Sequence, residues 1–191
     1  MEQKQEVVYY QAKGGKYRWV AVTALLLAIG AILKMVTPGV AGITPNWTIA
    51  MYCIAINLIR PSLGQSAGIG LVAGAVNIPF SKSAFPYGNL ASELVGAVVC
   101  AVIVNAAFEI KLGQMNIRPA VTGFLSTICS GLVFTGILKI VLSLPLEAYL
   151  YGMLPVVFIT GAINTVITQL LYLPAQRLFE ANGGQHVRNS N

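Results

Sequence analysis

The sequence predicts an all-α membrane protein, a bundle of six transmembrane helices, and composition and hydropathy support this prediction. Of the 191 residues, 56% are hydrophobic and only 9% are charged, and the mean hydropathy is +0.73. A soluble domain carries roughly 25% charged residues, so this chain has too little charge to cover a surface in water. Its apolar residues fall into six runs separated by Pro, Gly and Asn, which is typical of successive membrane spans.

The six runs form one expected membrane domain, residues 19–174, between polar tails at 1–18 and 175–191. The first run lacks a convincing cleavage site, so we expect a retained span and not a signal peptide. In front of the second run, Thr44 can cap a helix and Pro45 suits its first turn. As a helix this run would be only roughly 21 Å long, which is shorter than the hydrocarbon core of roughly 30 Å. The predicted spans are 19–36, 46–59, 62–80, 90–110, 119–144 and 152–174.

Flanking charges give an independent test of this topology. With six crossings and both termini cytoplasmic, nine basic residues lie inside and three outside, which is the positive-inside pattern of a multi-pass protein in a bacterial plasma membrane. The net charge of +6 is then explained by topology and indicates no nucleic-acid partner. The inner residues are Lys4, Lys13, Lys16, Arg18, Arg60, Lys111, Arg118, Arg177 and Arg188, and the outer ones are Lys34, Lys82 and Lys139.

Missing residue types argue against an enzyme. The chain contains no Asp, and its one His, His186, lies in the C-terminal tail, which excludes a Ser-His-Asp triad. No phosphate-binding G-x-x-x-x-G-K-[ST] motif is present, so ATP hydrolysis by that route is excluded. Cys53, Cys100 and Cys129 lie in apolar runs without C-x-x-C spacing and are interpreted as small buried hydrophobes. We therefore expect no metal and no cofactor.

Aromatic and amide side chains gather on the expected outer side, in or beside loops 37–45, 81–89 and 145–151. Apolar walls with a few polar groups suit a small-molecule pocket, whereas an interfacial aromatic belt is the simpler alternative for the rings. Thr160, Asn164 and Thr168 also recur every four residues, a stripe best explained by hydrogen bonds between helices. The predicted ligand contacts are Asn46, Trp47, Asn77, Phe85, Tyr87, Asn89, Glu93, Tyr149 and Asn164.

Glu93 is the most informative of these residues. It lies four residues after Asn89, so the two share a helix face near the outer end of a span. A carboxylate near a membrane interior must be paired, hydrated or turned into a cavity, and it is a functional candidate by default. The alternative is a structural ion pair with Lys82 or Lys139.

Small residues line two helices. Ala21, Ala24, Ala28 and Ala31 occupy one face of the first span, which indicates close packing either inside the chain or against a separate membrane subunit. In the third span, overlapping G-x-x-x-G spacings favour packing within the chain. These involve Gly64, Gly68, Gly70 and Gly74.

Taken together, six spans in about 20 kDa, the alanine-striped first helix and the outer polar cluster resemble the substrate-binding S component of an energy-coupling factor (ECF) importer. The resemblance implies a membrane-embedded binder of a small nutrient that closes its outer loops over the ligand and topples in the membrane to release it. It also implies docking through an Ala-x-x-x-Ala face, here Ala24 to Ala28, on a coupling membrane subunit that works with two ATPases.

Two segments are most similar to tryptophan-type S components. Gly42-Ile43-Thr44-Pro45-Asn46 has a comparable Pro-Asp/Asn start, and Phe85-Pro86-Tyr87-Gly88-Asn89 is similar to a Phe-Pro-Gly outer loop, with Tyr87 in place of a glycine. The biotin-type loop signature is missing, while a thiamin- or riboflavin-type ligand stays open. A stand-alone secondary transporter or channel is the main alternative, but the chain shows neither an internal repeat nor an ionisable residue at the centre of a span.

Overall fold

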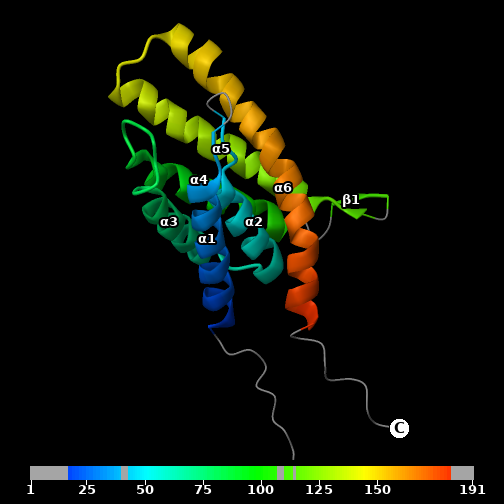
Figure 1. The fold of residues 1–191 in the computed structure, drawn as a ribbon. Coiled ribbons are helices and arrows are strands. Elements are labelled where there is room, and N and C mark those ends of the chain that lie inside the picture. The colour runs from blue at the N-terminus through cyan, green and yellow to red at the C-terminus, as the bar shows by residue number, and fades with distance from the viewer. Residues whose placement is uncertain (1–16, 40–42, 107–109, 114, 182–191) are drawn as a thin grey trace, which may run out of the picture.

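The computed structural model describes residues 17–39, 43–106, 110–113 and 115–181, and these residues form a helical bundle (Figure 1). The all-helical prediction is confirmed, since each of the six apolar runs contains one helix. A π-helical turn, η1, leads into the last helix, and a hairpin of two-residue strands, which the sequence did not predict, joins α4 to α5. The elements are α1 (Arg18–Val36), α2 (Trp47–Ile59), α3 (Leu63–Asn77), α4 (Gly88–Ala106), β1 (Lys111–Leu112), β2 (Met115–Asn116), α5 (Arg118–Val141), η1 (Ala148–Met153) and α6 (Leu154–Ala181).

Several helix ends differ from prediction; α3 and α5, for example, each end three residues before the predicted position. Asn46, and not Thr44, caps α2, because its side chain accepts a bond from the Ile49 backbone nitrogen (3.3 Å). α4 ends at Ala106, before the hairpin. α6 continues through Pro174 into the segment that we predicted as a polar tail. The predicted flanking charges Lys4, Lys13, Lys16 and Arg188, the motif residue Gly42 and the histidine at position 186 lie outside the described residues.

Four segments of the described chain are long and apolar enough to cross a membrane: Trp19–Val36, Gly88–Ala106, Arg118–Val141 and Ala148–Phe179. α2 and α3 have 13 and 15 residues, which makes them about 20 Å and about 22 Å long, shorter than the hydrocarbon core. The start of α1 and the end of α6 lie at the same end of the bundle (Figure 1). Six full crossings and cytoplasmic termini stay predictions.

α2 forms the centre of the bundle. Every residue from 48 to 57 is buried, and the helix contacts α1, α3, α4, α5 and α6. This burial follows from a sequence without any charged residue between 47 and 59. Cys53 and Cys100 are buried in this core, as expected for small hydrophobes.

α3 and α4 pack at very short distance through glycines. A Cβ atom on Gly74 would lie 2.7 Å from Asn89 O, and one on Gly70 would lie 2.6 Å from Glu93 O. Packing within the chain is therefore confirmed for this pair of glycines. The prediction is wrong for Gly64 and Gly68, because a Cβ atom on either would meet nothing within 4 Å among the described residues.

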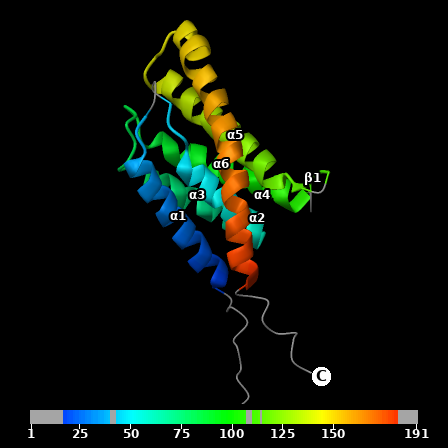
Figure 2. The same cartoon turned by 45° about the vertical axis from the view of Figure 1, so that its right-hand side comes forward.

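α1 lies along one edge of the bundle (Figure 2). Its buried face holds Thr23, Leu27 and Gly30 and packs mainly on α2. The predicted alanine stripe is mostly on the opposite side: Ala21, Ala24 and Ala28 are exposed, and Ala31 is half-buried. Ala21, Ala24 and Ala28 therefore take little part in packing against the described residues of the chain.

Candidate functional site

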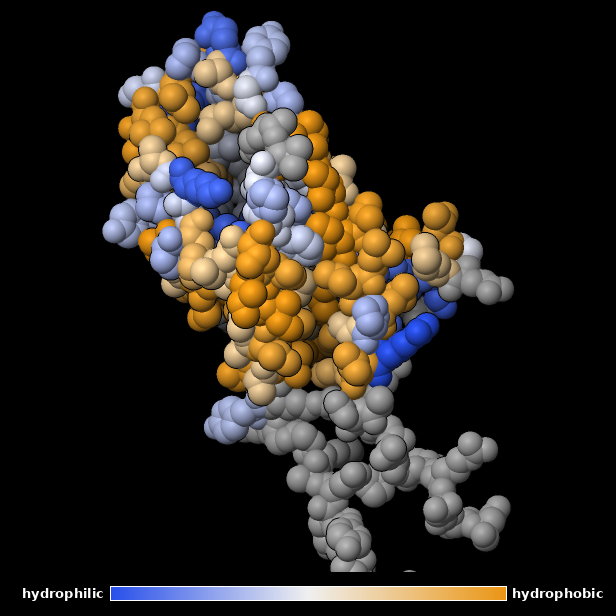
Figure 3. Space-filling model, viewed as in Figure 1, coloured by the Kyte–Doolittle hydropathy of each residue, from blue (hydrophilic) through white to orange (hydrophobic). Residues whose placement is uncertain are grey.

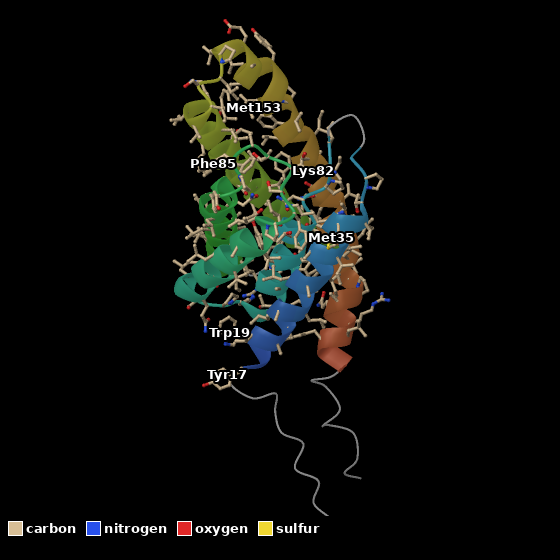
Figure 4. All side chains as sticks on the ribbon, turned by 60° about the vertical axis from the view of Figure 1, so that its left-hand side comes forward. Tyr17, Trp19, Met35, Lys82, Phe85 and Met153 are labelled. Carbon is tan, nitrogen blue, oxygen red and sulfur yellow. The ribbon has the colours of Figure 1, made fainter. Side chains whose placement is uncertain are left out.

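A cavity of about 470 Å³ lies at the end of the bundle that carries η1. Polar side chains gather at this end of the molecule, whereas hydrophobic side chains cover its middle (Figure 3). Lys82, Phe85 and Met153 lie at this end, and Tyr17 and Trp19 lie at the other (Figure 4). The polar lining includes Lys34, Thr37, Asn46, Lys82, Asn89, Ser92, Glu93, Thr127, Ser130, Thr135 and Thr160, and the apolar lining includes Trp47, Phe80, Phe134, Leu138, Met153, Val156 and Val157.

Glu93 lies in the wall of this cavity and is only 1% exposed. Its Oε1 accepts hydrogen bonds from Asn77 Nδ2 (2.9 Å) and Asn46 Nδ2 (3.2 Å). Its Oε2 has no hydrogen-bond partner among the described residues. This oxygen is itself buried, and the hydroxyl of Tyr52, which is also buried and has no other partner in the described chain, interacts with the same carboxyl group. Glu93 is the one acidic residue in the cavity lining among the described residues, so its carboxylate is the natural partner for a cationic donor of a ligand.

Asn77 connects Glu93 to a lysine. Asn77 Oδ1 accepts bonds from Lys34 Nζ (2.8 Å) and Thr48 Oγ1 (2.9 Å), while its Nδ2 donates to Glu93. The close approach of α3 to α4 at Gly74 brings Asn77, three residues later, to the start of α4. One amide thus lies between a cation and an anion that both line the cavity. Asn77 itself is fully buried and does not line the cavity, which corrects its prediction as a ligand contact.

The predicted ion pair of Glu93 with Lys82 or Lys139 is not formed in the described part of the chain. Both hydrogen-bond partners of Glu93 are amide groups. Lys82 lies in the loop after α3 and is exposed, and Lys139 does not line the cavity. The lysine that the amide network joins to Glu93 is Lys34, which projects from the last turn of α1.

Asn164 fixes the position of Asn46. The Asn46 backbone nitrogen donates to Asn164 Oδ1 (3.1 Å), and Asn164 Nδ2 donates to the Asn46 backbone oxygen (3.1 Å) and to Thr127 Oγ1 (2.9 Å). The predicted hydrogen bonding between helices is therefore confirmed at Asn164, which does not itself line the cavity. Through Lys34, Thr48 and Thr127, the side chains of Asn46, Asn77, Glu93 and Asn164 form one network that joins all six α-helices of the described chain.

The aromatic predictions divide into two groups. Trp47 lines the cavity, and its Nε1 donates to Thr37 Oγ1 (2.8 Å). Phe85, Tyr87 and Tyr149 do not line it, which corrects their prediction as ligand contacts. Backbone bonds from Gly88 N to Phe85 O and from Asn89 N to Pro86 O wind this loop into the start of α4. The rings of Phe85 and Tyr87 contact each other, with their centroids 6.0 Å apart and their planes at 62°, and Tyr87 is 61% exposed. Gly152 and Met153, and not Tyr149, reach the cavity from η1.

The sequence analysis missed several residues that line the cavity, although Lys34 and one face of α5 carried a signal. Lys34 is the only charged residue between 19 and 59, and we interpreted it only as a marker of topology. On α5, cavity residues recur at helical spacing, from Thr127 through Ser130 and Phe134 to Leu138. Phe80 and Met153 carried no comparable pattern.

A second polar cluster joins α2 to α5 at the opposite end of the bundle. Arg118 is 3% exposed; its Nε donates to Asn57 Oδ1 (2.9 Å), and a terminal guanidinium nitrogen donates to Asn57 O (3.1 Å). Asn57 Nδ2 then donates to Thr122 Oγ1 (2.8 Å). This cluster lies away from the cavity, so we interpret it as structural.

Comparisons with known proteins agree on one family. The family model described as "Tryptophan transporter TrpP" matches residues 16–179. A "Probable tryptophan transport protein" of Clostridium perfringens (strain 13 / Type A) is 33% identical over 168 residues, covering 80% of this chain and 88% of the relative. One of the same description from Clostridium acetobutylicum is 28% identical over 152 residues, covering 76% of this chain and 86% of the relative. No solved structure matches.

Proposed function

Because the chain belongs to the tryptophan transporter TrpP family, we propose that it binds tryptophan in the cavity around Glu93 and works as the substrate-binding subunit of an ECF importer in the cell membrane. Family membership and several long apolar helices support a multi-pass transport protein and not an enzyme. The observation that carries the ligand assignment is a cavity lined both by charged side chains and by apolar and aromatic ones. Free tryptophan combines the same features, with a charged backbone at one end and an indole ring at the other.

The cavity has the size and lining that an indole ring requires. Its volume of about 470 Å³ lies within the range of roughly 300–1,000 Å³ that is usual for small-ligand sites. We place the ring among Trp47, Phe80 and Phe134, where each aromatic contact contributes about 0.5–1.5 kcal/mol beyond area burial. Hydroxyl groups such as those of Ser130 and Thr160 are available as acceptors for the indole N–H.

A charged side chain of the lining provides the partner for the ligand ammonium. Glu93 is the one acidic residue of the described cavity lining, and a charge-assisted hydrogen bond to its carboxylate is about twice as strong as a neutral one. Asn89 lines the cavity one turn earlier, and its Nδ2 is bound to Pro86 O (2.7 Å). Its Oδ1 is therefore assigned as a second, weaker acceptor. Asn46, Asn77 and Asn164 hold Glu93 in place.

Coupling to an energy source requires other subunits. The sequence has no phosphate-binding loop, so ATP must be hydrolysed by separate ATPases that act through a coupling membrane subunit. The exposed alanines of α1 are the proposed docking face, because small side chains let two helices approach closely in lipid. This role is consistent with alanines that take little part in packing within the described chain.

Uptake measurements test the coupling role. In cells that carry an energy-coupling module, Ala24→Leu should abolish tryptophan uptake while the affinity of the purified variant stays that of the original chain. Ala162→Leu is the matched control, since Ala162 is an exposed alanine on α6, away from the stripe. Accumulation of tryptophan against a gradient by the purified chain alone in liposomes would contradict the coupling role and favour a stand-alone transporter.

A further inference from the structure

Two opposite charges in the cavity lining share one buried amide. Lys34 and Glu93 both line the cavity, and the side chain of Asn77 lies between them. The amide presents its oxygen to the ammonium of Lys34 (2.8 Å) and its nitrogen to the carboxylate of Glu93 (2.9 Å). The distance between the two charged groups is therefore the length of one amide and two hydrogen bonds.

Both charged groups keep unused binding capacity. A lysine ammonium has three donors, and the hydrogen bonds described for Lys34 use one of them. A carboxylate can accept about four hydrogen bonds, and Glu93 accepts two, both at Oε1. The Tyr52 hydroxyl interacts with this carboxyl group from the buried side, and Glu93 also lines the cavity, where its remaining acceptor capacity faces a ligand.

Resting on the proposed function, we propose that Lys34 and Glu93 together form the subsite for the amino-acid backbone, with Lys34 binding the carboxylate and Glu93 the ammonium. A free α-amino acid has the same polarity as the Asn77 amide, negative oxygen at one end and N–H donors at the other, over a similarly short length. It can therefore span the same two charges from the cavity side, while the buried Asn77 joins them behind the lining. The subsite selects intact α-amino acids over congeners that lack either group.

Charge balance favours a zwitterion in this place. The charges of Lys34 and Glu93 cancel, and a zwitterionic α-amino acid also has no net charge. Ligand binding therefore adds no net charge to a partly buried site. A tryptamine cation or an indole-3-propionate anion would each leave one protein charge without its partner. Truncating one member of a buried charge pair is costly for this reason.

Lys82 is the competing cation, since it also lines the cavity. It is exposed, however, and lies in the loop after α3, whereas Lys34 is half-buried and held by Asn77. An ammonium that is already held in place loses less conformational freedom on binding, and its charge acts more strongly away from water. The geometry therefore points to Lys34.

Competition binding to the full-length wild-type protein in detergent tests the selection directly. Radiolabelled tryptophan is displaced by unlabelled tryptophan, tryptamine or indole-3-propionate. We expect both congeners to compete at least about tenfold more weakly than tryptophan, because each lacks one charge-assisted contact. Tryptamine that competes as well as tryptophan would overturn the assignment of a carboxylate contact, and indole-3-propionate that does so would overturn that of the ammonium contact.

Variants assign the two contacts to residues. Lys34→Met should weaken tryptophan about tenfold or more and leave tryptamine unchanged, since tryptamine has no carboxylate to lose; Lys34→Arg should restore much of the loss. Glu93→Gln should weaken tryptophan and leave indole-3-propionate unchanged. Lys139→Met, a lysine of α5 outside the cavity lining, is the control and should change neither ligand.

The outcomes separate this inference from the proposed function. If the wild-type chain binds no tryptophan, the proposed function fails and the subsite fails with it. If the wild type binds tryptophan but Lys34→Met weakens tryptophan and tryptamine equally, Lys34 is structural and only the subsite is wrong. If Lys82→Met, and not Lys34→Met, gives the selective loss, the carboxylate contact belongs to Lys82. A Lys34→Met protein that does not fold leaves the wild-type competition series as the deciding measurement.

Discussion

Gly74→Ala perturbs the site from a distance, because Gly74 sets how closely α3 approaches α4. The added Cβ atom would lie 2.7 Å from both Asn89 O and Leu90 Cα, and both are backbone atoms that cannot rotate away. An ordinary van der Waals contact is about 3.4–4 Å, so the helices must separate by roughly 0.7 Å or more at this point. Overpacking of this kind costs about 1–3 kcal/mol of stability.

The separation should also reach the ligand. Asn77 follows Gly74 on α3, whereas its acceptor Glu93 follows Asn89 on α4, so moving the helices apart stretches the 2.9 Å bond between them. We therefore expect Gly74→Ala to lower both the apparent melting temperature and the affinity for tryptophan. For a chain of this length, 1 kcal/mol corresponds to roughly 2–4 °C.

Gly68→Ala is the matched control on the same helix. A Cβ atom there would meet nothing within 4 Å among the described residues, and alanine is a better helix former than glycine by about 0.8–1 kcal/mol. It should leave binding unchanged and keep or raise the melting temperature. The two variants are compared by thermal unfolding in detergent and by equilibrium binding of radiolabelled tryptophan. Equal behaviour of the two variants would refute the argument from close packing.

Four further substitutions separate effects on binding from effects on stability. Glu93→Gln should lower tryptophan affinity about tenfold or more without reducing the yield of folded protein, using about 1.5–3 kcal/mol for a hydrogen bond to a charged group; a destabilised variant with normal affinity would contradict the ligand role. Arg118→Met should lower the melting temperature and leave tryptophan affinity intact. The buried Asn57 loses the hydrogen bonds donated by Arg118, which costs roughly 1–3 kcal/mol of stability. Lost affinity at full stability would show that this cluster acts on the cavity. Trp47→Ala should weaken tryptophan binding measurably and Tyr87→Ala should not, since Trp47 lines the cavity and Tyr87 is exposed; the reverse order in a binding titration would return Tyr87 to the site.

The helices were predictable because local features define them. Apolar runs bounded by Pro and Gly gave six elements whose ends mostly lie within a few residues of the observed helices. The exceptions were also local: Asn46 competes with Thr44 as a cap, and Pro174 is accommodated inside α6. The hairpin between α4 and α5 has two-residue strands, too short for any periodicity.

The site was predictable only in its polar half. Asn46, Asn77 and Glu93 could be grouped because successive spans bring alternate loops to one side of a bundle, and the structure joins them by hydrogen bonds. The link from Glu93 through Asn77 to Lys34 was not predictable, because Lys34 reaches Asn77 across 43 positions of sequence. The sequence also could not show which aromatic side chains of the segment between α3 and α4 line the cavity. Phe80 and Phe85 lie close together in sequence, but only Phe80 lines the cavity.

Equilibrium binding of radiolabelled tryptophan to the purified full-length chain, with no other subunit present, tests the central claim most directly. Saturable binding of one tryptophan per chain, lost or strongly weakened in Glu93→Gln but retained in Lys139→Met, is the predicted result. A wild-type chain that is folded and monodisperse yet binds no tryptophan, or one whose affinity is the same in Glu93→Gln, would contradict a tryptophan site built around Glu93.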